Sequence, residues 1–296
     1  MPGLEIHALS ELRDEAAALL AERFAAQRAT EPLLPDVDDF GAHLPEDGHV
    51  ATRGGRAVAY LGGAVDGDMA RWQFAGHAAR EPEALRDLFA QQAAESGVRR
   101  FMVTVPATDP ALVDAWFRLA FGCQAVWAVR ETDGDVAVQL QHTYVRPATP
   151  DDLEALVDFD HLLYEHQQAT PSFSEFSAPT REESRREAAD LWTGPYHSFL
   201  AERDGEASGL LVLYERPEGD LRVPAGNVDI AFMATRPEVQ GTGAGLALTA
   251  HAFAWAREHG YRSLTVDWRT VNLLSSRFWP NRGFRPQYLR LYRAVP

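Results

Sequence analysis

The chain contains no lysine, so its 28 basic residues are all arginine. A single cysteine, Cys123, cannot form an internal disulfide and is most simply a small core residue. No cysteine and histidine residues have the spacing of a zinc site, so we expect no metal. No run approaches the length of a membrane span, and the N-terminal residues lack a signal-peptide pattern. We therefore expect a cytoplasmic protein without membrane contact.

Positive charge is scarce relative to negative charge, with 28 basic and 43 acidic residues and a net charge of -15. Nucleic-acid binding needs clustered positive charge, so this balance disfavours it and suits a cationic, amine-bearing substrate better. A hydrophobic fraction of 46% is typical of globular proteins, and 296 residues are enough for two domains. The sequence does not distinguish a monomer from a homodimer.

Glycine, in contrast, is concentrated in residues 240–245, which have the sequence Gln-Gly-Thr-Gly-Ala-Gly. This segment lies between an apolar, β-prone run at 228–235 and a helical pattern at 246–259. The first backbone N–H groups of a helix have no partner within it, and glycine lets a phosphate approach them closely. The segment therefore predicts a binding site for a cofactor that carries a pyrophosphate.

Two other phosphate-binding loops fit the spacing less well. A Walker-type loop needs Lys and then Ser or Thr after its last glycine, where this chain has Leu246. A dinucleotide fold has G-x-G-x-x-G after its first strand, whereas this G-x-G-x-G occurs late in the chain. Asp267 follows the glycine loop at about the spacing of the acidic residue in dinucleotide folds, so a dinucleotide oxidoreductase remains an alternative. A glycine-rich helix cap that binds no ligand is a further alternative.

The segment 229–284 resembles the core of the GNAT superfamily of N-acetyltransferases. Its Gln/Arg-x-x-Gly-x-Gly/Ala motif is matched by Gln240, Gly243 and Gly245. Residues 233–237 resemble the family's splayed strand ending, which offers backbone groups to the pantetheine arm. Asn272 and the later Gly-Phe pair resemble the family's Asn, helix and turn.

This resemblance implies a mixed α/β fold, with a central mixed sheet flanked by helices, and acetyl-CoA (coenzyme A) as the cofactor. It also implies transfer of the acetyl or a short acyl group by direct attack of an amine. The cofactor-binding residues that it implies are Met233, Ala234, Thr235, Gln240, Gly241, Thr242, Gly243, Ala244, Gly245, Asn272 and Ser275.

An internal repeat indicates two related domains. Residues 97–105 resemble 260–268, and residues 115–122 resemble 277–284, at an offset of roughly 163 residues. At this offset the glycine loop corresponds to 77–82, which contains no glycine and ends in Pro82, a residue without an N–H group. We therefore predict tandem GNAT-like domains: a degenerate, cofactor-free one at 1–142 and a catalytic one at 143–296.

The boundary between the halves is marked by a turn at 132–135, a predicted strand at 136–144 and a proline-flanked start at 146–152. A helix is predicted from 153 to 164, with Thr149 or Asp151 as its cap. Residues 167–179 are rich in Ser, Thr and Pro, which predicts an exposed connection between two helices. In GNAT proteins this region commonly lines the acceptor site.

Attack on a thioester requires a neutral amine, so a base should lie nearby. Asp229 is the first candidate, because alternation along the strand puts it on the same face as Met233 and Thr235. An acid in an apolar strand should also have a raised pKa. The alternatives are an ion pair of Asp229 with an arginine, or a base at Asp267 or His197.

Two further histidines, His161 and His166, flank a tyrosine on the predicted helix and could contact a substrate. Many GNAT members have a tyrosine that protonates the leaving thiolate, but Trp279 occupies that position here. An indole N–H is not an acid near neutral pH. The proton for the leaving thiolate would then come from solvent, from a serine such as Ser275, or from Tyr288 of the final strand.

The sequence therefore favours an acyl-CoA-dependent N-acetyltransferase that acts on a small-molecule amine. A non-catalytic acyl-CoA-binding or regulatory protein is the alternative, which the absent tyrosine favours. Small metabolites, antibiotics, peptide N-termini and protein lysines all stay open as acceptors.

Overall fold

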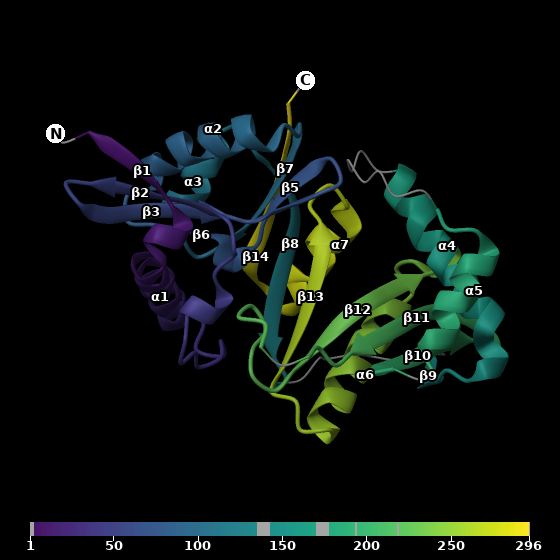
Figure 1. Cartoon of the computed structure of the whole chain (residues 1–296). Coiled ribbons are helices and arrows are strands. Elements are labelled where there is room, and N and C mark those ends of the chain that lie inside the picture. The colour runs from purple at the N-terminus through teal and green to yellow at the C-terminus, as the bar shows by residue number, and fades with distance from the viewer. Residues whose placement is uncertain (1–2, 135–142, 170–177, 193, 218, 296) are drawn as a thin grey trace. The chain divides into compact units, whose positions relative to one another are not determined.

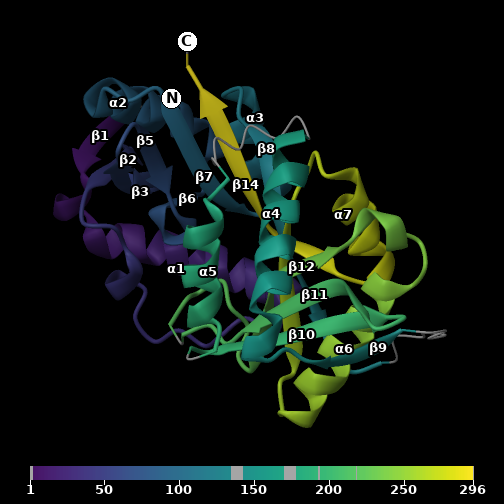
Figure 2. The same cartoon turned by 90° about the vertical axis from the view of Figure 1, so that its right-hand side faces the viewer.

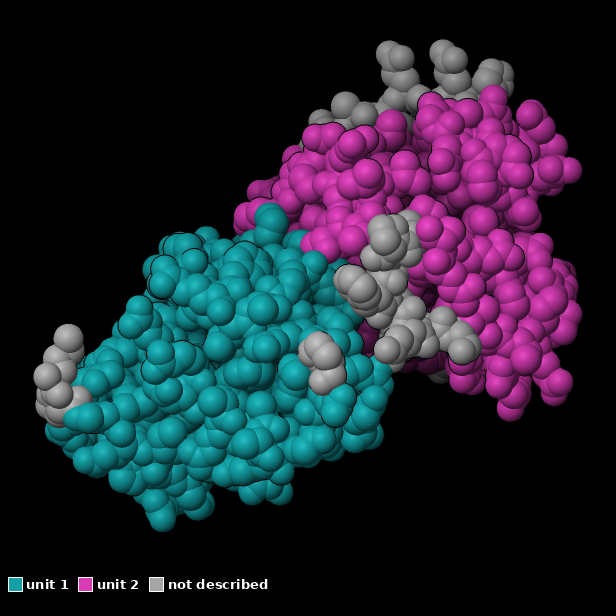
Figure 3. Space-filling view, turned by 90° about the horizontal axis from the view of Figure 1, so that it is seen from above, with its two compact units in different colours: residues 1–127, 220–224, 286–296 teal, residues 128–219, 225–285 magenta. Residues whose placement is uncertain are grey.

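The computed structural model describes residues 3–134, 143–169, 178–192, 194–217 and 219–295 (Figure 1). Two compact units make up the chain, and Figure 3 colours them separately. The first unit contains residues 1–127, 220–224 and 286–296, and the second contains 128–219 and 225–285. The first unit thus includes two segments from the C-terminal half of the sequence. The predicted strand at 136–144 falls outside the described residues up to position 142.

The first unit holds two sheets and three helices among its described residues. One sheet is antiparallel and has the order β1-β2-β3-β6, and the other contains the order β4-β5-β7-β14. The elements are β1 (Leu4–Ala8), α1 (Arg13–Thr30), β2 (Gly48–Arg53), β3 (Arg56–Gly62), β4 (Ala64–Asp66), β5 (Met69–Trp72), β6 (His77–Ala79), α2 (Leu85–Ser96), β7 (Arg100–Pro106), α3 (Pro110–Arg118), β8 (Gly122–Glu131), which continues into the second unit, and β14 (Arg285–Ala294).

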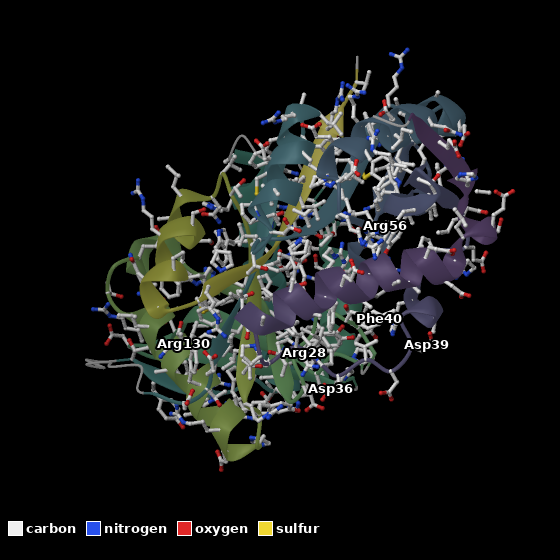
Figure 4. The ribbon with its side chains drawn as sticks, turned by 90° about the vertical axis from the view of Figure 1, so that its left-hand side faces the viewer. Arg28, Asp36, Asp39, Phe40, Arg56 and Arg130 are labelled. Carbon is white, nitrogen blue, oxygen red and sulfur yellow. The ribbon has the colours of Figure 1, made fainter. Side chains whose placement is uncertain are left out.

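Aromatic residues fill the core of the first unit. Trp72 stacks on Phe101 with ring centroids 5.7 Å apart, and Trp116 packs against Phe121 at 5.0 Å. A second cluster lies under α1, where the long loop after this helix is held by the Arg28–Asp36 ion pair and by Phe40 (Figure 4). These contacts give the first unit a core of its own.

The second unit has one sheet, whose strand order is β13-β12-β11-β10-β9. The β12/β13 pair is parallel, and the other pairs in this unit are antiparallel. Its elements are β9 (Tyr144–Pro147), α4 (Leu153–Ala169), α5 (Arg181–Asp190), β10 (Tyr196–Arg203), β11 (Glu206–Tyr214), β12 (Asn227–Thr235), α6 (Ala244–Glu258), β13 (Ser263–Arg269) and α7 (Leu273–Phe278). The mixed α/β class predicted from the sequence is confirmed.

Helices cover both faces of this sheet. α4 and α5 pack on one face, where Phe159 and Ala188 belong to the same buried cluster as Leu210 of β11, and they lie toward the viewer in Figure 2. α6 packs on the other face, where a Cβ at Gly209 would come within 2.9 Å of the Leu248 side chain. Gly209 therefore permits the close approach of α6 to the strand.

The predicted internal repeat is confirmed by matching backbone hydrogen bonds at an offset of 163 residues. Phe121 N donates to Trp116 O, and Phe284 N donates to Trp279 O, both at 3.3 Å. Each turn also contains a residue with positive φ: Ala120 at 60° and its equivalent, Gly283, at 79°. Both copies place a parallel strand before this helix and turn, β7 beside β5 and β13 beside β12.

Candidate functional site

The site begins where β12 and β13 separate. Their parallel pairing ends at Ile230 and Val266, although β12 continues to Thr235 and β13 to Arg269 (Figure 1). After Ile230, β12 forms no further backbone pair with β13 among the residues that the structure describes. The strand ending predicted to splay from its neighbour does so, and it leaves backbone N–H and C=O groups available to a ligand.

A one-residue register shift in β12 re-aims its side chains. Leu213 pairs with Ile230 and Val212 with Phe232, so Ala231 is the extra residue of a bulge. Side chains alternate along a strand, and one inserted residue reverses the faces beyond it. Asp229 therefore lies on the face opposite to Met233, and the prediction that they share a face is wrong. Strict alternation could not reveal a bulge.

Asp229 is buried in a polar network between β12 and β13. One carboxylate oxygen accepts a hydrogen bond from Arg216 at 2.7 Å, and the other accepts from Thr265 Oγ1 at 2.7 Å. Asn227 donates to the same threonine hydroxyl at 2.8 Å and accepts from Ser263 at 2.9 Å. The arginine ion pair was the alternative that the sequence left open, and it is the arrangement in the structure.

The glycine loop leads into α6 with left-handed backbone at two glycines. The φ angles are +79° at Gly241 and +102° at Gly243, the residue that precedes the helix. A Cβ at either position would meet no atom within 4 Å, so the backbone conformation itself requires glycine there. Gly245 has another role, because a Cβ there would lie 3.3 Å from the Phe278 ring.

Backbone N–H groups of this loop are available for an anion. Among the described residues, no acceptor is found for the N–H groups of Gly241, Gly243, Ala244 and Gly245. The partial positive charge of a helix N-terminus lies at the same place. Unpaired donors at a glycine-rich helix start are the arrangement that binds phosphate in many proteins.

These elements surround a cavity of about 360 Å³ in the second unit. Apart from Thr242, every residue that the sequence predicts to bind the cofactor lines it. The side chain of Thr242 instead donates to Val239 O at 2.7 Å. The lining residues are Leu162, Leu163, His166, Met233, Ala234, Thr235, Pro237, Val239, Gln240, Gly241, Gly243, Ala244, Gly245, Leu246, Asn272, Leu274, Ser275, Phe278, Trp279 and Arg282.

The short helix α7 closes one side of this cavity. The Asn272 side chain accepts from Leu274 N at 3.1 Å and from Ser275 N at 3.2 Å, and so caps the helix. α7 ends at Phe278, directly before the Trp279-Pro280 pair, as the proline predicts. Trp279 is buried and packs edge-on against Phe278.

Arg282 and His166 are the only titratable side chains among the described residues that line the cavity. The guanidinium of Arg282 lies 3.4 Å from the centroid of the Phe278 ring and donates to Phe278 O at 2.6 Å. Its buried Nε has no partner among the described residues, and partial burial lowers the pKa of the group. Arg282 was not among the predicted site residues, because the Gly-Phe pair beside it predicts a turn but not a place near the glycine loop.

Two residues considered for catalysis lie elsewhere. Tyr288 belongs to the first unit, where its ring packs 5.0 Å from that of Phe74 and burial raises the pKa of its hydroxyl. His197 pairs with Glu215 at 2.8 Å and packs on Trp255. Neither is among the described residues that line the cavity.

The equivalent of the glycine loop in the first unit is built differently. The N–H groups of Arg80 and Glu81 both donate to Val58 O, at 2.8 Å and 3.2 Å. Pro82 follows and has no N–H group to donate. The backbone donors that are free in the second unit are therefore engaged or missing here.

One part of the chain, which contains this site, is similar to a known protein family. Residues 161–284 match the model described as the acetyltransferase (GNAT) family. The matched range includes the cavity-lining residues. No protein of curated function matches the chain in sequence.

Solved structures show the same fold along nearly the whole chain. A tandem GNAT protein from the clavulanic acid biosynthesis pathway is 17% identical, with a TM-score of 0.55 and coverage of 99% of each chain. A GCN5-related N-acetyltransferase from Sphaerobacter thermophilus is 14% identical, with a TM-score of 0.59, over 98% of this chain and 95% of that one. A GNAT-family acetyltransferase from Colwellia psychrerythraea is 12% identical, with a TM-score of 0.55, over 99% of this chain and 100% of that one. The chain has the tandem GNAT fold.

The described residues contain no helix long and apolar enough to cross a membrane. In the same residues, no group of three or more His, Cys, Asp or Glu side chains is placed to hold a metal ion.

Proposed function

We propose that the second unit is an acyl-CoA-dependent N-acyltransferase that transfers an acetyl or short acyl group to a small-molecule amine. The observation that carries this proposal is the set of unpaired N–H groups at Gly241, Gly243, Ala244 and Gly245, which line the cavity beside the splayed end of β12. This combination offers donors for a diphosphate and a backbone edge for an extended chain of amide groups.

Acetyl-CoA fits the residues that are present. The free N–H groups of the loop hold its diphosphate, Arg282 supplies a positive charge for phosphate, and the edge of β12 at 233–235 binds the pantetheine amides. When bound, this cofactor supplies an activated acyl group as a thioester. The side chains of Leu162 and Phe278 give the cavity apolar walls.

The acceptor amine must lose a proton, and we assign its removal to His166. This imidazole lines the cavity, and imidazole is a base near neutral pH. Asp229, the candidate from the sequence, is tied to Arg216 and Thr265 on the other face of β12. Its carboxylate holds the two strands together up to the point where they separate.

The test is release of free thiol from acetyl-CoA in the presence of a panel of small amines. We expect turnover with at least one amine, and a loss of kcat of about 10²- to 10⁴-fold for His166→Gln, which removes the general base. Stabilisation by acetyl-CoA without thiol release from any amine would instead indicate an acyl-CoA-binding protein.

Asp229→Asn separates the two candidate bases. We expect this variant to lose thermal stability, because Arg216 loses its ionised partner, but to keep most of its kcat. A folded Asp229→Asn variant that loses kcat, while His166→Gln keeps it, would assign the base to Asp229.

We further propose that the first half binds no coenzyme A, since the N–H groups of Arg80 and Glu81 are engaged with Val58. Its role is then to support the second unit. The net charge of -15 favours cationic acceptors over anionic ones.

A further inference from the structure

The first unit has a cavity of about 360 Å³ of its own. Its walls are α1, the residues after β6 and the connection from β7 to α3, and Figure 4 shows α1 running across this side of the unit. Six of its lining residues are polar or charged: Glu22, Arg23, Gln27, Arg80, Thr108 and Asp109. This volume lies within the range of small-molecule sites.

Arg23 is a buried charge without a carboxylate. It is 8% exposed, and its guanidinium donates to two backbone carbonyls, those of His77 and Phe74, the latter at 2.6 Å. In the described part of the chain, no carboxylate oxygen lies within 4.0 Å of this guanidinium, and its Nε has no hydrogen-bond partner. A buried cation that is not neutralised destabilises the protein, so an anion beside Arg23 would be bound favourably.

Gln27, one turn further along α1, is also unsatisfied. It is 3% exposed, and neither its amide oxygen nor its amide nitrogen has a partner of normal geometry among the described residues. The Tyr288 hydroxyl is close enough to the Gln27 amide to interact with it, but the two groups make no hydrogen bond of normal geometry. Buried polar groups are rarely left unpaired, and a polar ligand in the adjoining cavity would satisfy them.

The opposite wall of the cavity carries negative charge. Asp109 caps α3 by accepting from Leu112 N at 2.9 Å with one oxygen, which leaves the other oxygen available. It is near enough to Arg23 for their charges to interact. Glu22 is already neutralised by its hydrogen bonds with Arg80. Among the described residues, the cavity therefore offers one cation without a carboxylate within 4.0 Å and one carboxylate with spare acceptor capacity.

We propose that this cavity binds a small zwitterion of the amino-acid class, with its carboxylate toward Arg23 and its ammonium group toward Asp109. Gln27 and Thr108 supply the remaining hydrogen bonds. The site is separate from the cofactor cavity of the second unit and does not depend on its function. Coenzyme A is a poor fit, because the N–H groups of Arg80 and Glu81 are engaged and cannot hold a diphosphate.

Thermal shift and ligand-observed NMR on the full chain, with each of the common amino acids at millimolar concentration, test this proposal. We expect at least one amino acid to bind, and its matched probes to fail: the amine that lacks the carboxylate and the acid that lacks the ammonium group. Addition of coenzyme A should not displace it. Binding of none, equal binding of a matched probe, or displacement by coenzyme A would overturn the proposal.

Asp109→Asn is the informative variant, because asparagine also caps helices and should preserve the fold. We expect its affinity for the amino acid to fall at least about tenfold, since a charge-assisted hydrogen bond is lost. Its affinity for acetyl-CoA should stay unchanged, which separates this proposal from the proposed acyltransferase. Unchanged affinity for the amino acid in this folded variant would contradict the assignment of the site.

Discussion

The three glycines of the loop at 240–245 are required for two different physical reasons. Gly241 and Gly243 have positive φ in open space, so a side chain there would strain the backbone without meeting another atom. Gly245 has ordinary backbone but lies against Phe278. The sequence showed that glycine is needed here, and the structure shows why at each position.

Residue patterns left out Arg282, and they offered His166 only as one of two histidines that could contact a substrate. Arg282 and His166 both reach the cavity from elements outside the glycine loop, and each occurs in a segment whose composition is unremarkable. Arg282 and His166 line the same cavity because of tertiary contacts, which a local sequence motif does not predict. Asp229, in contrast, was recognisable as an acid in an apolar strand, but its partner Arg216 was not.

His77 in the first unit makes the stability of the protein depend on pH. It is fully buried, its Nε2 lies 2.9 Å from Thr104 O, and burial lowers its pKa from 6.5 to about 3. Between these two pH values the unfolded chain binds a proton that the folded chain does not. We therefore expect the free energy of unfolding to fall, as pH falls from 6.5, by about 1.4 kcal/mol per pH unit from this group.

Denaturant unfolding of the wild type and of His77→Gln at several pH values isolates this contribution. Glutamine keeps a donor near Thr104 O but does not titrate. The difference in unfolding free energy between the two proteins should shrink steadily from pH 6.5 downward. A difference that does not vary with pH would show that His77 is not the group responsible.

At the level of elements, the bulge at Ala231 sets which side chains and backbone groups face the cofactor cavity. Deletion of Ala231 restores regular alternation and turns either the start or the end of β12 to the other face. We expect the variant to keep its helix and strand content by circular dichroism but to lose acetyl-CoA binding. Unchanged binding affinity would mean that the bulge does not position Met233 and Thr235.

Strands and helices of the second unit could largely be predicted from the sequence, because their periodic patterns are local. The β-prone run at 228–235 lies within β12, and the helix predicted from 246 begins at Ala244. The bulge was not predictable, since it depends on the register with β11. The final strand was recognised as a strand, but its pairing with β7 depends on residues nearly 200 positions apart.

On the scale of the whole molecule, the two sequence halves are not independent structural units. Residues 286–296 and 220–224 belong to the first unit, where β14 pairs with β7 and Leu221 enters the cluster beneath α1. Leu291 and Tyr288 are buried in the same unit. A chain reduced to 143–296 would expose these side chains, at a cost of about 1.5–3 kcal/mol for each buried leucine.

We therefore expect the isolated segment 143–296 to be insoluble or to melt without cooperativity, whereas the full chain unfolds cooperatively. Circular dichroism during heating and soluble yield measure this. A cooperative transition of the isolated segment, together with acetyl-CoA binding, would show that the exchanged segments contribute little.

In the proposed function, the unpaired N–H groups of the glycine loop bind the diphosphate of acetyl-CoA. Isothermal calorimetry with acetyl-CoA on the wild type and on Gly243→Leu measures this binding, with Gly260→Leu as the matched control. Both glycines have positive φ and open space around them, but only Gly243 lines the cavity. Arg80→Gln, in the equivalent loop of the first unit, is the second control.

We predict that the wild type and both controls bind, and that Gly243→Leu binds at least about 100-fold more weakly, equivalent to about 2.7 kcal/mol. The contrary result is the absence of any heat of binding to the folded wild type, or equal affinity of Gly243→Leu and Gly260→Leu.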